Sequence, residues 1–330
     1  MKLTIIIPVY NGADFIEKSY NSIINQQLED FELLYVNNNS KDASEERIQT
    51  FVEKDSRVKL LQQPKQGAAA ARNMGISKAK GDYVYIFDVD DEIYPNALNK
   101  MIAVLDNHPD RYAVFGKMVK SHKGISDTIK PSDETDQVIL KDKPFWGLHW
   151  FSSLKSVVGP PAFLYRRTVF SKIGVYNEGI KNTEDTALDI KLGMTCDIAY
   201  LDTYVYLYFK HAQSTIEMAK VNEDLVSMHW TRFVKSHLPF YKENEVPVLY
   251  KKLLYAYLYK TTAKRICKTR GYSKRNNLLN EIKAEIKPVE FPFGLRFFLL
   301  IMTFFPLSFI LKFYLYYLVP FYMKNHIETL

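Results

Sequence analysis

Short apolar runs alternate with segments of helical periodicity through the first hundred residues. The run from Leu3 to Val9 ends in a turn signal, and apolar residues then recur at helical spacing. The same order repeats three more times, with strands at 31–36, 58–62 and 83–87 and helices at 43–54, at 68–79 and from about Pro95. This alternation predicts an α/β fold with a parallel sheet and helices on both of its faces.

Polar residues stand where the first, second and fourth predicted strands end. The first strand ends at Pro8, Tyr10 and Asn11, the second at residues 37–42, and the fourth runs into an acidic cluster. Ligands of parallel sheets bind beyond the carboxyl ends of the strands, so we expect a ligand site at this edge. No GxGxxG follows the first strand and no GxxxxGK[ST] occurs in the chain. Neither the dinucleotide fingerprint nor the P-loop is therefore present.

The acidic cluster contains Asp88, Asp90, Asp91 and Glu92, with only Val89 between them. Carboxylates this close repel one another unless a cation lies among them. Mg²⁺ and Mn²⁺ take hard oxygen ligands and are commonly held by one or two carboxylates together with substrate phosphates. The cluster therefore predicts a metal site that serves a diphosphate. The alternative is an acidic turn whose carboxylates complement the dipole of the following helix.

Cysteine usage and the N-terminus indicate the compartment. The chain has 330 residues, of which 47% are hydrophobic, and only two cysteines, Cys196 and Cys267, which lie far apart. Such a pair forms neither a disulfide framework nor a zinc site, which favours a reducing compartment. The N-terminal apolar run ends at Pro8 and is too short for the core of a signal peptide. We therefore expect a cytoplasmic protein.

The C-terminal third combines positive charge with apolar runs. The formal net charge is +7, and residues 251–275 hold nine basic residues and no acidic one. Apolar residues dominate from 297 to 323, but Pro306, Lys312 and Pro320 interrupt them, whereas a spanning helix needs about 20 consecutive apolar residues. This pattern predicts helices lying on an anionic membrane, peripheral on the inner face of the plasma membrane. The alternative is a pair of apolar helices packed on the protein's own core. A nucleic-acid partner is not expected, because no reading motif accompanies the basic residues.

Five segments together resemble family 2 inverting glycosyltransferases of the GT-A fold. They are IIIPVYN at 5–11, VNNNSKD at 36–42, QGAAAARNMGISKAKGDYVYIFDVDDE at 66–92, RRTVFSKIGVYNEG at 166–179 and NTEDTALDIKLG at 182–193. The resemblance covers roughly residues 2–215. It implies a Rossmann-like nucleotide-sugar-binding half at 1–115 and an acceptor-binding half with the catalytic base at 116–220. Residues 221–330 would then form a helical, membrane-associating extension.

The resemblance also implies a role for individual residues of the donor site. The nucleotide-sugar-binding positions are Pro8, Tyr10, Asn11, Asn38, Gly67, Arg72, Asp88 and Asp90. Asn38 matches an Asp that meets the nucleobase in the family, and its amide oxygen can still accept a bond from a uracil N3–H. Asn residues at 37–39 replace the family's Asp-Asp-Gly, which removes two charges from this loop, and UDP is the expected nucleotide.

The metal and the base are implied in the same way. Asp90 and Asp88 would hold Mn²⁺ or Mg²⁺, and His211 stands where the family has a His that binds metal or diphosphate. Asp185 matches the proposed base that deprotonates the acceptor hydroxyl. Glu184 and Asp185 could instead be the N-terminal acids of a helix. Residues 159–163 would form an acceptor wall, and Trp146 and Trp150 would stack on a sugar or fill the core.

These features predict a metal-dependent inverting glycosyltransferase. It would move a hexosyl or N-acetylhexosaminyl group from a nucleoside diphosphate to a hydroxyl of a saccharide or lipid-linked acceptor, in cell-surface polysaccharide synthesis. The alternative is a catalytically idle nucleotide-sugar-binding subunit that scaffolds a partner transferase; the presence of Asp88, Asp90 and Asp185 argues against it. A homo-oligomer is left open.

Overall fold

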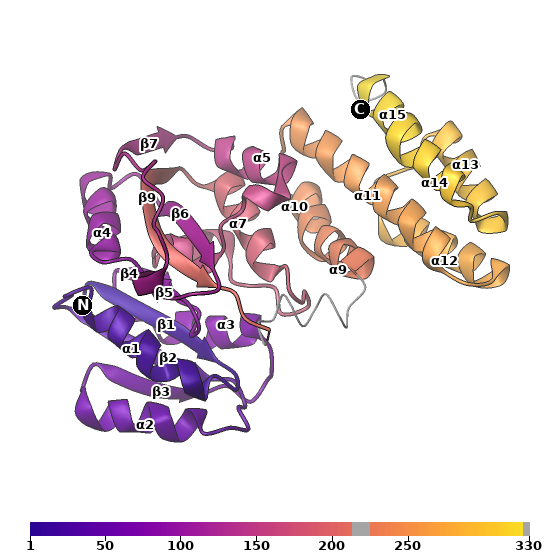
Figure 1. Ribbon diagram of the computed structural model, residues 1–330. Coiled ribbons are helices and arrows are strands. Elements are labelled where there is room, and N and C mark those ends of the chain that lie inside the picture. Colours follow the sequence, from indigo (N-terminus) through magenta and orange to yellow (C-terminus); the bar gives the residue numbers. More distant parts are fainter. Residues whose placement is uncertain (213–224, 326–330) are drawn as a thin grey trace. The chain divides into compact units, whose positions relative to one another are not determined.

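The computed structural model describes residues 1–212 and 225–325 (Figure 1). The chain forms two compact units, one of Met1–Glu178 with Glu184–Met218 and one of Gly179–Thr183 with Ala219–Leu330. The boundary predicted at residues 115 and 116 falls inside strand β6 (Ala113–Ser121), so both predicted halves contribute to one sheet. The boundary predicted at residues 220 and 221 lies outside the described residues.

The first four strands form the parallel part of this sheet. They are β1 (Leu3–Val9), β2 (Phe31–Asn37), β3 (Val58–Gln62) and β4 (Tyr83–Ile86), in the order β3-β2-β1-β4. Nearly all side chains of β1, β2 and β4 are buried, because a parallel sheet is covered on both faces. The parallel sheet predicted from the sequence is confirmed.

The sheet continues with strands of mixed direction. They are β5 (Glu92–Ile93), β6, β7 (Val138–Lys141), β8 (Phe163–Arg166) and β9 (Ile198–Phe209). β8 runs antiparallel to β4 and β6, β6 runs parallel to β9, and β9 pairs antiparallel with β5 and β7. The sequence pattern did not predict this half, because its strands do not alternate with helices of similar length.

The helices of the first unit flank this sheet. They are α1 (Ile16–Ile24), α2 (Ser44–Lys54), α3 (Ala68–Lys78), α4 (Ala97–Asn107), α5 (Phe145–Ser152), α6 (Val169–Ile173) and α7 (Glu184–Thr195). The connections through α1 and α2 lead from β1 to β2 and from β2 to β3, in one direction across the sheet, whereas α3 leads from β3 back to β4 on the other side of β1. Because such crossovers are right-handed, α3 lies on the opposite face of the sheet from α1 and α2. Gly75 of α3 lies against Ile6, where a Cβ atom would overlap the isoleucine side chain. The Ala-rich and Gly-containing sequence thus brings α3 close to the sheet.

The second unit is helical. Its helices are α9 (Leu225–Arg232), α10 (Leu238–Glu243), α11 (Val248–Lys268), α12 (Tyr272–Glu285), α13 (Phe293–Phe304), α14 (Ser308–Phe313) and α15 (Val319–Asn325). Leu254 and Leu258 of α11 and Leu295 and Leu299 of α13 are fully buried in its core. Pro306 separates α13 from α14, as the sequence indicated. The predicted helical C-terminal region is confirmed.

Several of the nine clustered basic residues, Lys251, Arg265 and Arg275 among them, have partners within this unit. Arg275 is buried, and its guanidinium donates to the carbonyl oxygens of Thr303 at 2.6 Å and Phe304 at 3.4 Å, where α13 ends. Arg265 lies over the ring of Trp230, 4.6 Å from its centroid. Part of the basic cluster therefore stabilises the helical unit itself. Among the described helices, none has both the length and the apolar character needed to cross a bilayer.

Candidate active site

The carboxyl ends of β1 and β2 bring the first two polar segments together. Pro8 lies opposite Val36 and Val9 opposite Asn37 in the parallel register, and the Asn38 N–H donates to the Val9 carbonyl oxygen at 2.8 Å. Asn11 accepts the Lys41 N–H through Oδ1 at 2.8 Å. The ring of Tyr10, which follows β1, is half exposed. The strand-end residues predicted from the sequence thus form one edge, with an aromatic ring open to solvent.

Asn38 holds the loop that leads into α3. Its Oδ1 accepts the Gly67 N–H at 2.7 Å, and its Nδ2 donates to the carbonyl oxygens of Gln63 at 3.1 Å and Lys65 at 2.7 Å. An Asp at this position could not make the two donations, since an ionised carboxylate only accepts. Gly67 has a φ of 138°, which favours glycine at this point. The predicted contact between Asn38 and a nucleobase remains a prediction, and its amide nitrogen serves the fold.

Arg72 joins two acidic segments that are far apart in the sequence. From α3, its Nη2 donates to Asp88 Oδ1 at 3.0 Å and its Nη1 donates to Glu184 Oε1 at 2.9 Å. Its side chain is 8% exposed. Burial opposes its charged form, but the carboxylates of Asp88 and Glu184 outweigh burial and hold the pKa of Arg72 above its ordinary value. A buried cation thus fixes the acidic cluster after β4 next to the start of α7.

Asp90 and His211 form the second contact of the acidic cluster. Asp90 Oδ2 and His211 Nε2 lie 2.8 Å apart, and His211 comes from the segment that follows β9. The rings of Phe15 and Phe209 flank the imidazole at centroid distances of 5.1 and 5.5 Å and restrict its orientation. Burial and the nearby Asp88 charge raise the pKa of Asp90. The acidic turn with Asp88 and Asp90 and the segment with His211, which the sequence analysis placed separately, thus meet through the contact between Asp90 and His211.

This donor set fits a divalent metal that also uses substrate oxygens. Cis ligands of an octahedral ion at about 2.1 Å lie about 3 Å apart, close to the 2.8 Å between Asp90 Oδ2 and His211 Nε2. Within residues 1–212 and 225–325, no group of three or more His, Cys, Asp or Glu side chains could hold a metal alone. A diphosphate would therefore have to supply the remaining ligands.

Glu184 and Asp185 open α7 but have different surroundings. Glu184 is buried and paired with Arg72; burial and the Asp185 charge raise its pKa, against the attraction of Arg72. Asp185 is partly exposed, and its Oδ1 accepts the Thr186 N–H at 2.6 Å. Of the two acids, Asp185 is the one that solvent or an acceptor can reach. The sequence did not reveal that Glu184 is the partner of Arg72.

Two further buried acids were given no individual role from the sequence. Asp91 is buried next to the cluster, and its Oδ1 accepts the Phe209 N–H at 2.9 Å, which ties β9 to the acidic turn. Asp189 is fully buried one helical turn after Asp185. Burial, together with the Asp185 charge, raises the pKa of Asp189 well above its ordinary value. The four-residue spacing from Asp185 could have identified Asp189 as a neighbour on the same helix face.

The predicted acceptor residues belong largely to an aromatic cluster. Trp150 is buried, with its ring centroid 5.1 Å from that of Phe115, and Trp146 stacks on Trp150 at 5.9 Å. Pro160 and Pro161 are buried as well. Trp150 therefore fills the core, whereas Trp146 is only partly buried.

The comparison with known families identifies the chain. The family model described as glycosyl transferase family 2 matches residues 4–174, which is just over half of the sequence. The chain belongs to glycosyl transferase family 2. It is 25% identical over 218 residues to the glycosyltransferase EpsJ of Bacillus subtilis. This match covers 66% of the chain but 63% of EpsJ, so the chain spans less than two thirds of that relative.

Solved structures share the fold of this family member. Residues 1–349 of S. aureus TarS, in complex with UDP-GlcNAc, match with a TM-score of 0.55 and 18% identity, covering 92% of this chain and 91% of that one. The mannosyltransferase PcManGT from Pyrobaculum calidifontis, in complex with GDP-Man and Mn²⁺, matches with a TM-score of 0.51 and 14% identity, covering 96% and 87%. The predicted GT-A fold is confirmed.

Proposed function

We propose that this protein transfers a sugar from a nucleoside diphosphate to a hydroxyl group with inversion at the anomeric carbon. The contact of Arg72 with both Asp88 and Glu184 carries this proposal. It joins the strand-end edge, where a donor would bind, to the start of α7, where Asp185 lies. A donor-binding group and a general base are thereby held in one compact unit.

The donor would lie on the edge formed by β1, β2 and β4. The half-exposed ring of Tyr10 offers an apolar face to a nucleobase. Asp90 and His211, with Asp88 beside them, would hold Mn²⁺ or Mg²⁺, which supplies Lewis-acid stabilisation of the departing diphosphate. The UDP-GlcNAc complex of TarS and the GDP-Man and Mn²⁺ complex of PcManGT are consistent with this class of donor. UDP is the nucleotide we propose.

Asp185 would act as the base. A single displacement needs one base, on the face of the sugar opposite the leaving group, to take the proton of the attacking hydroxyl. The oxygen of the acceptor then forms the new bond to the anomeric carbon while the bond to the diphosphate breaks. Glu184 cannot easily take this role, because it is buried and paired with Arg72. Its role would be to hold Arg72 and the helix terminus in place.

The acceptor would be a saccharide or a lipid-linked sugar used in cell-surface polysaccharide synthesis, and the protein would work on the inner face of the plasma membrane. The exposed apolar side chains of α13 and α14, such as Phe293 and Phe309, support attachment to a lipid surface. The exposed basic residues of α11 and α12 would add attraction to anionic lipids.

A donor screen tests the proposal. The purified chain with Mn²⁺ would be offered UDP-, GDP- and TDP-sugars, and release of the nucleoside diphosphate would be measured with and without EDTA. We expect turnover with one donor class that EDTA abolishes and that Asp90→Ala lowers by a factor on the order of 10² or more. Asp82→Ala is the matched control, because Asp82 is an exposed acid that directly precedes the first residue of β4. Full activity of Asp90→Ala, or indifference to EDTA, would contradict the metal-dependent mechanism.

A further inference from the structure

Helix α13 is apolar on two opposite sides. Leu295, Leu299 and Met302 face the core of the helical unit and are fully buried. Phe293, Phe297, Leu300 and Phe304 follow at spacings of four, three and four residues and are exposed. A surface helix of a globular protein normally presents a polar outer face. The outer face of α13 instead has the composition of an interface.

The apolar surface continues beyond α13. Of the 23 large apolar side chains that are exposed in the described part of the chain, 11 lie between residues 293 and 321. They include Phe309 at 68% exposure and Tyr316 at 71%. The charged residues from 291 to 325 are Arg296, Lys312 and Lys324, with no Asp or Glu among them. This surface is therefore apolar, rich in aromatic rings and only positively charged.

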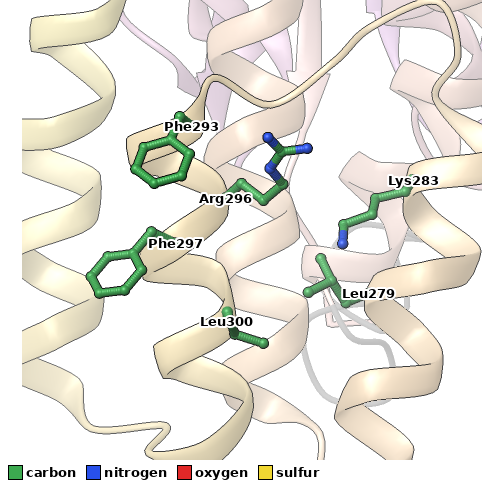
Figure 2. A pocket seen from close by; sticks show the side chains of 6 residues that line it. All are labelled: Leu279, Lys283, Phe293, Arg296, Phe297 and Leu300. Carbon is green, nitrogen blue, oxygen red and sulfur yellow. The ribbon is translucent and has the colours of Figure 1, made fainter.

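A pocket of about 280 Å³ lies at the start of this surface, between α12 and α13 (Figure 2). Its lining residues are Leu279, Lys283, Phe293, Arg296, Phe297 and Leu300. Figure 2 shows the side chains of Lys283 and Arg296 extending toward each other from the two helices. Two cations that share one hollow, with no carboxylate in its lining, repel each other until an anion binds.

The pocket thus combines two requirements that a single molecule can meet. An anion satisfies Lys283 and Arg296, and a hydrocarbon chain covers the apolar face that begins at Phe293. Inorganic phosphate would meet only the first requirement. A second copy of this surface would cover the apolar face, but it is positively charged and would supply no anion. Arg and Lys both bind phosphate oxygens by charge-assisted hydrogen bonds.

We propose that this pocket binds the phosphate and the adjoining acyl chain of an anionic phospholipid at a membrane surface. This inference rests on the membrane attachment proposed above and assigns it to a site. The phosphate lies between Lys283 and Arg296, and the acyl chain lies along Phe293, Phe297 and Leu300. The exposed rings of α14 and of residues 314–318 then lie at the depth of the headgroups.

The first test removes the charges. Partitioning of the full chain would be measured by flotation with vesicles of phosphatidylcholine alone and with about a third phosphatidylglycerol. Lys283→Gln with Arg296→Gln should weaken binding to the anionic vesicles roughly 30-fold, since each basic residue at the surface contributes about fivefold. Lys54→Gln with Lys242→Gln removes the same charge from exposed positions outside the pocket and outside α11 and α12, and should change binding to the anionic vesicles less than about threefold. Equal losses in the two variants would overturn the site.

The second test removes the apolar contacts. Phe293→Ser with Phe297→Ser should lower binding to both kinds of vesicle and should leave a residual attachment that high salt releases. Val248→Ser with Leu249→Ser, an exposed apolar pair at the start of α11, is the control. Because all four side chains are at least 48% exposed, thermal unfolding should show that both variants remain folded. Unchanged partitioning of the phenylalanine variant would overturn the proposal.

Two further outcomes assign the pocket to another occupant. If inorganic phosphate binds in a titration, if this binding depends on Lys283 and Arg296, and if the protein does not bind vesicles, a free anion is the favoured occupant. If sedimentation shows a dimer, if Phe293→Ser with Phe297→Ser dissociates it, and if the protein does not bind vesicles, a second copy of the chain is the favoured occupant. Wild-type protein that ignores vesicles refutes membrane attachment as well as the lipid site, whereas vesicle binding insensitive to the pocket variants refutes the site alone. Turnover of a soluble acceptor is a separate readout that none of the pocket variants should change.

Discussion

Charged side chains are buried at the strand ends of the first unit, whereas apolar side chains are exposed on the outer face of the second. Arg72 is 8% exposed and bonds to two carboxylates, while Phe293 is 77% exposed. Globular proteins usually do the reverse, with charges outside and phenylalanine inside. Each inversion costs stability unless a partner compensates it. At the strand ends the partners lie within the protein, and along α13 the partner has to come from outside.

This contrast separates the two kinds of residue for which a function is proposed. Arg72, Glu184 and Asp88 are fixed to one another without a ligand, so the proposed site is preorganised. The exposed rings of α13 are not held in a fixed geometry by polar partners, and contact with any apolar phase would be enough to bury them. We therefore expect substitutions at the strand ends to act on chemistry and stability, and substitutions on the outer face of α13 to act on location alone.

The largest effect is expected from Asp185. Asp185→Asn keeps the size of the side chain but removes its basicity, so turnover should fall by a factor on the order of 10² to 10⁴. Donor affinity should be nearly unchanged, and steady-state kinetics with varied donor would measure both quantities. Glu184→Gln is the matched variant one residue away and should lower stability more than it lowers chemistry. Near-normal turnover of Asp185→Asn with an inactive, folded Glu184→Gln would move the base to Glu184.

Arg72→Ala tests the buried charge cluster. It leaves the carboxylates of Asp88 and Glu184 without their shared cation, and breaking a buried pair in this way costs about 3–5 kcal/mol. Urea unfolding at pH 7 would measure the loss. Lys2→Ala breaks an exposed ion pair with Asp106, in which both side chains are at least 40% exposed, and should cost under about 1 kcal/mol. Equal losses would show that Arg72 is not the centre of the cluster.

The sequence predicted the ends of β1, β2 and β4 well because hydrophobic pattern and turn residues are local. Tyr10, Asp88 and Asp90 could be placed on one edge for the same reason. The pairing of Arg72 with Glu184 could not be predicted, since it joins residues 112 positions apart through the approach of α3 to α7. The order of β6, β8 and β9 was also beyond the pattern, because mixed strands are arranged by tertiary packing rather than by periodicity.

Asp189 gives a pH-dependent test of buried charge. Burial and the Asp185 charge raise the pKa of Asp189 in the folded state above its value in the unfolded chain. The folded state therefore keeps the proton at pH values where the unfolded chain has released it, and stability falls as the pH rises from about 4, by up to about 1.4 kcal/mol per unit. Asp189→Asn has no proton to lose, so it should be more stable than the wild type at pH 7 and similar at pH 4.

For Asp55 the stability depends on pH in the opposite direction, because folding lowers its pKa. Its hydrogen bonds from Arg57 lower its folded pKa to about 2. It therefore stabilises the fold above its ordinary pKa of about 4, and this contribution is lost as the pH falls toward 2. Asp55→Asn should be less stable than the wild type at pH 7, and the difference should shrink in acid. Urea unfolding from pH 3 to 8 measures both variants; parallel curves for Asp189→Asn and wild type would contradict the account.

The smallest effect on stability is expected on the outer face of the second unit. Phe309→Ser removes a ring that is 68% exposed and should change the free energy of unfolding by less than about 0.5 kcal/mol. Leu299→Ala, on the buried side of α13, should cost about 2–5 kcal/mol. Denaturant unfolding of the two variants sharpens the contrast between the faces. A large loss for Phe309→Ser would show that the exposed rings belong to the core.

Calorimetric titration of the active nucleotide sugar, in the presence of Mn²⁺, tests the central claim most directly. The claim is that Asp90 serves donor binding and Asp185 serves chemistry within one preorganised site. The account predicts that Asp185→Asn binds the donor with wild-type affinity and that Asp90→Ala shows no metal-dependent binding. Wild-type affinity in Asp90→Ala, or loss of binding in a folded Asp185→Asn, would contradict it.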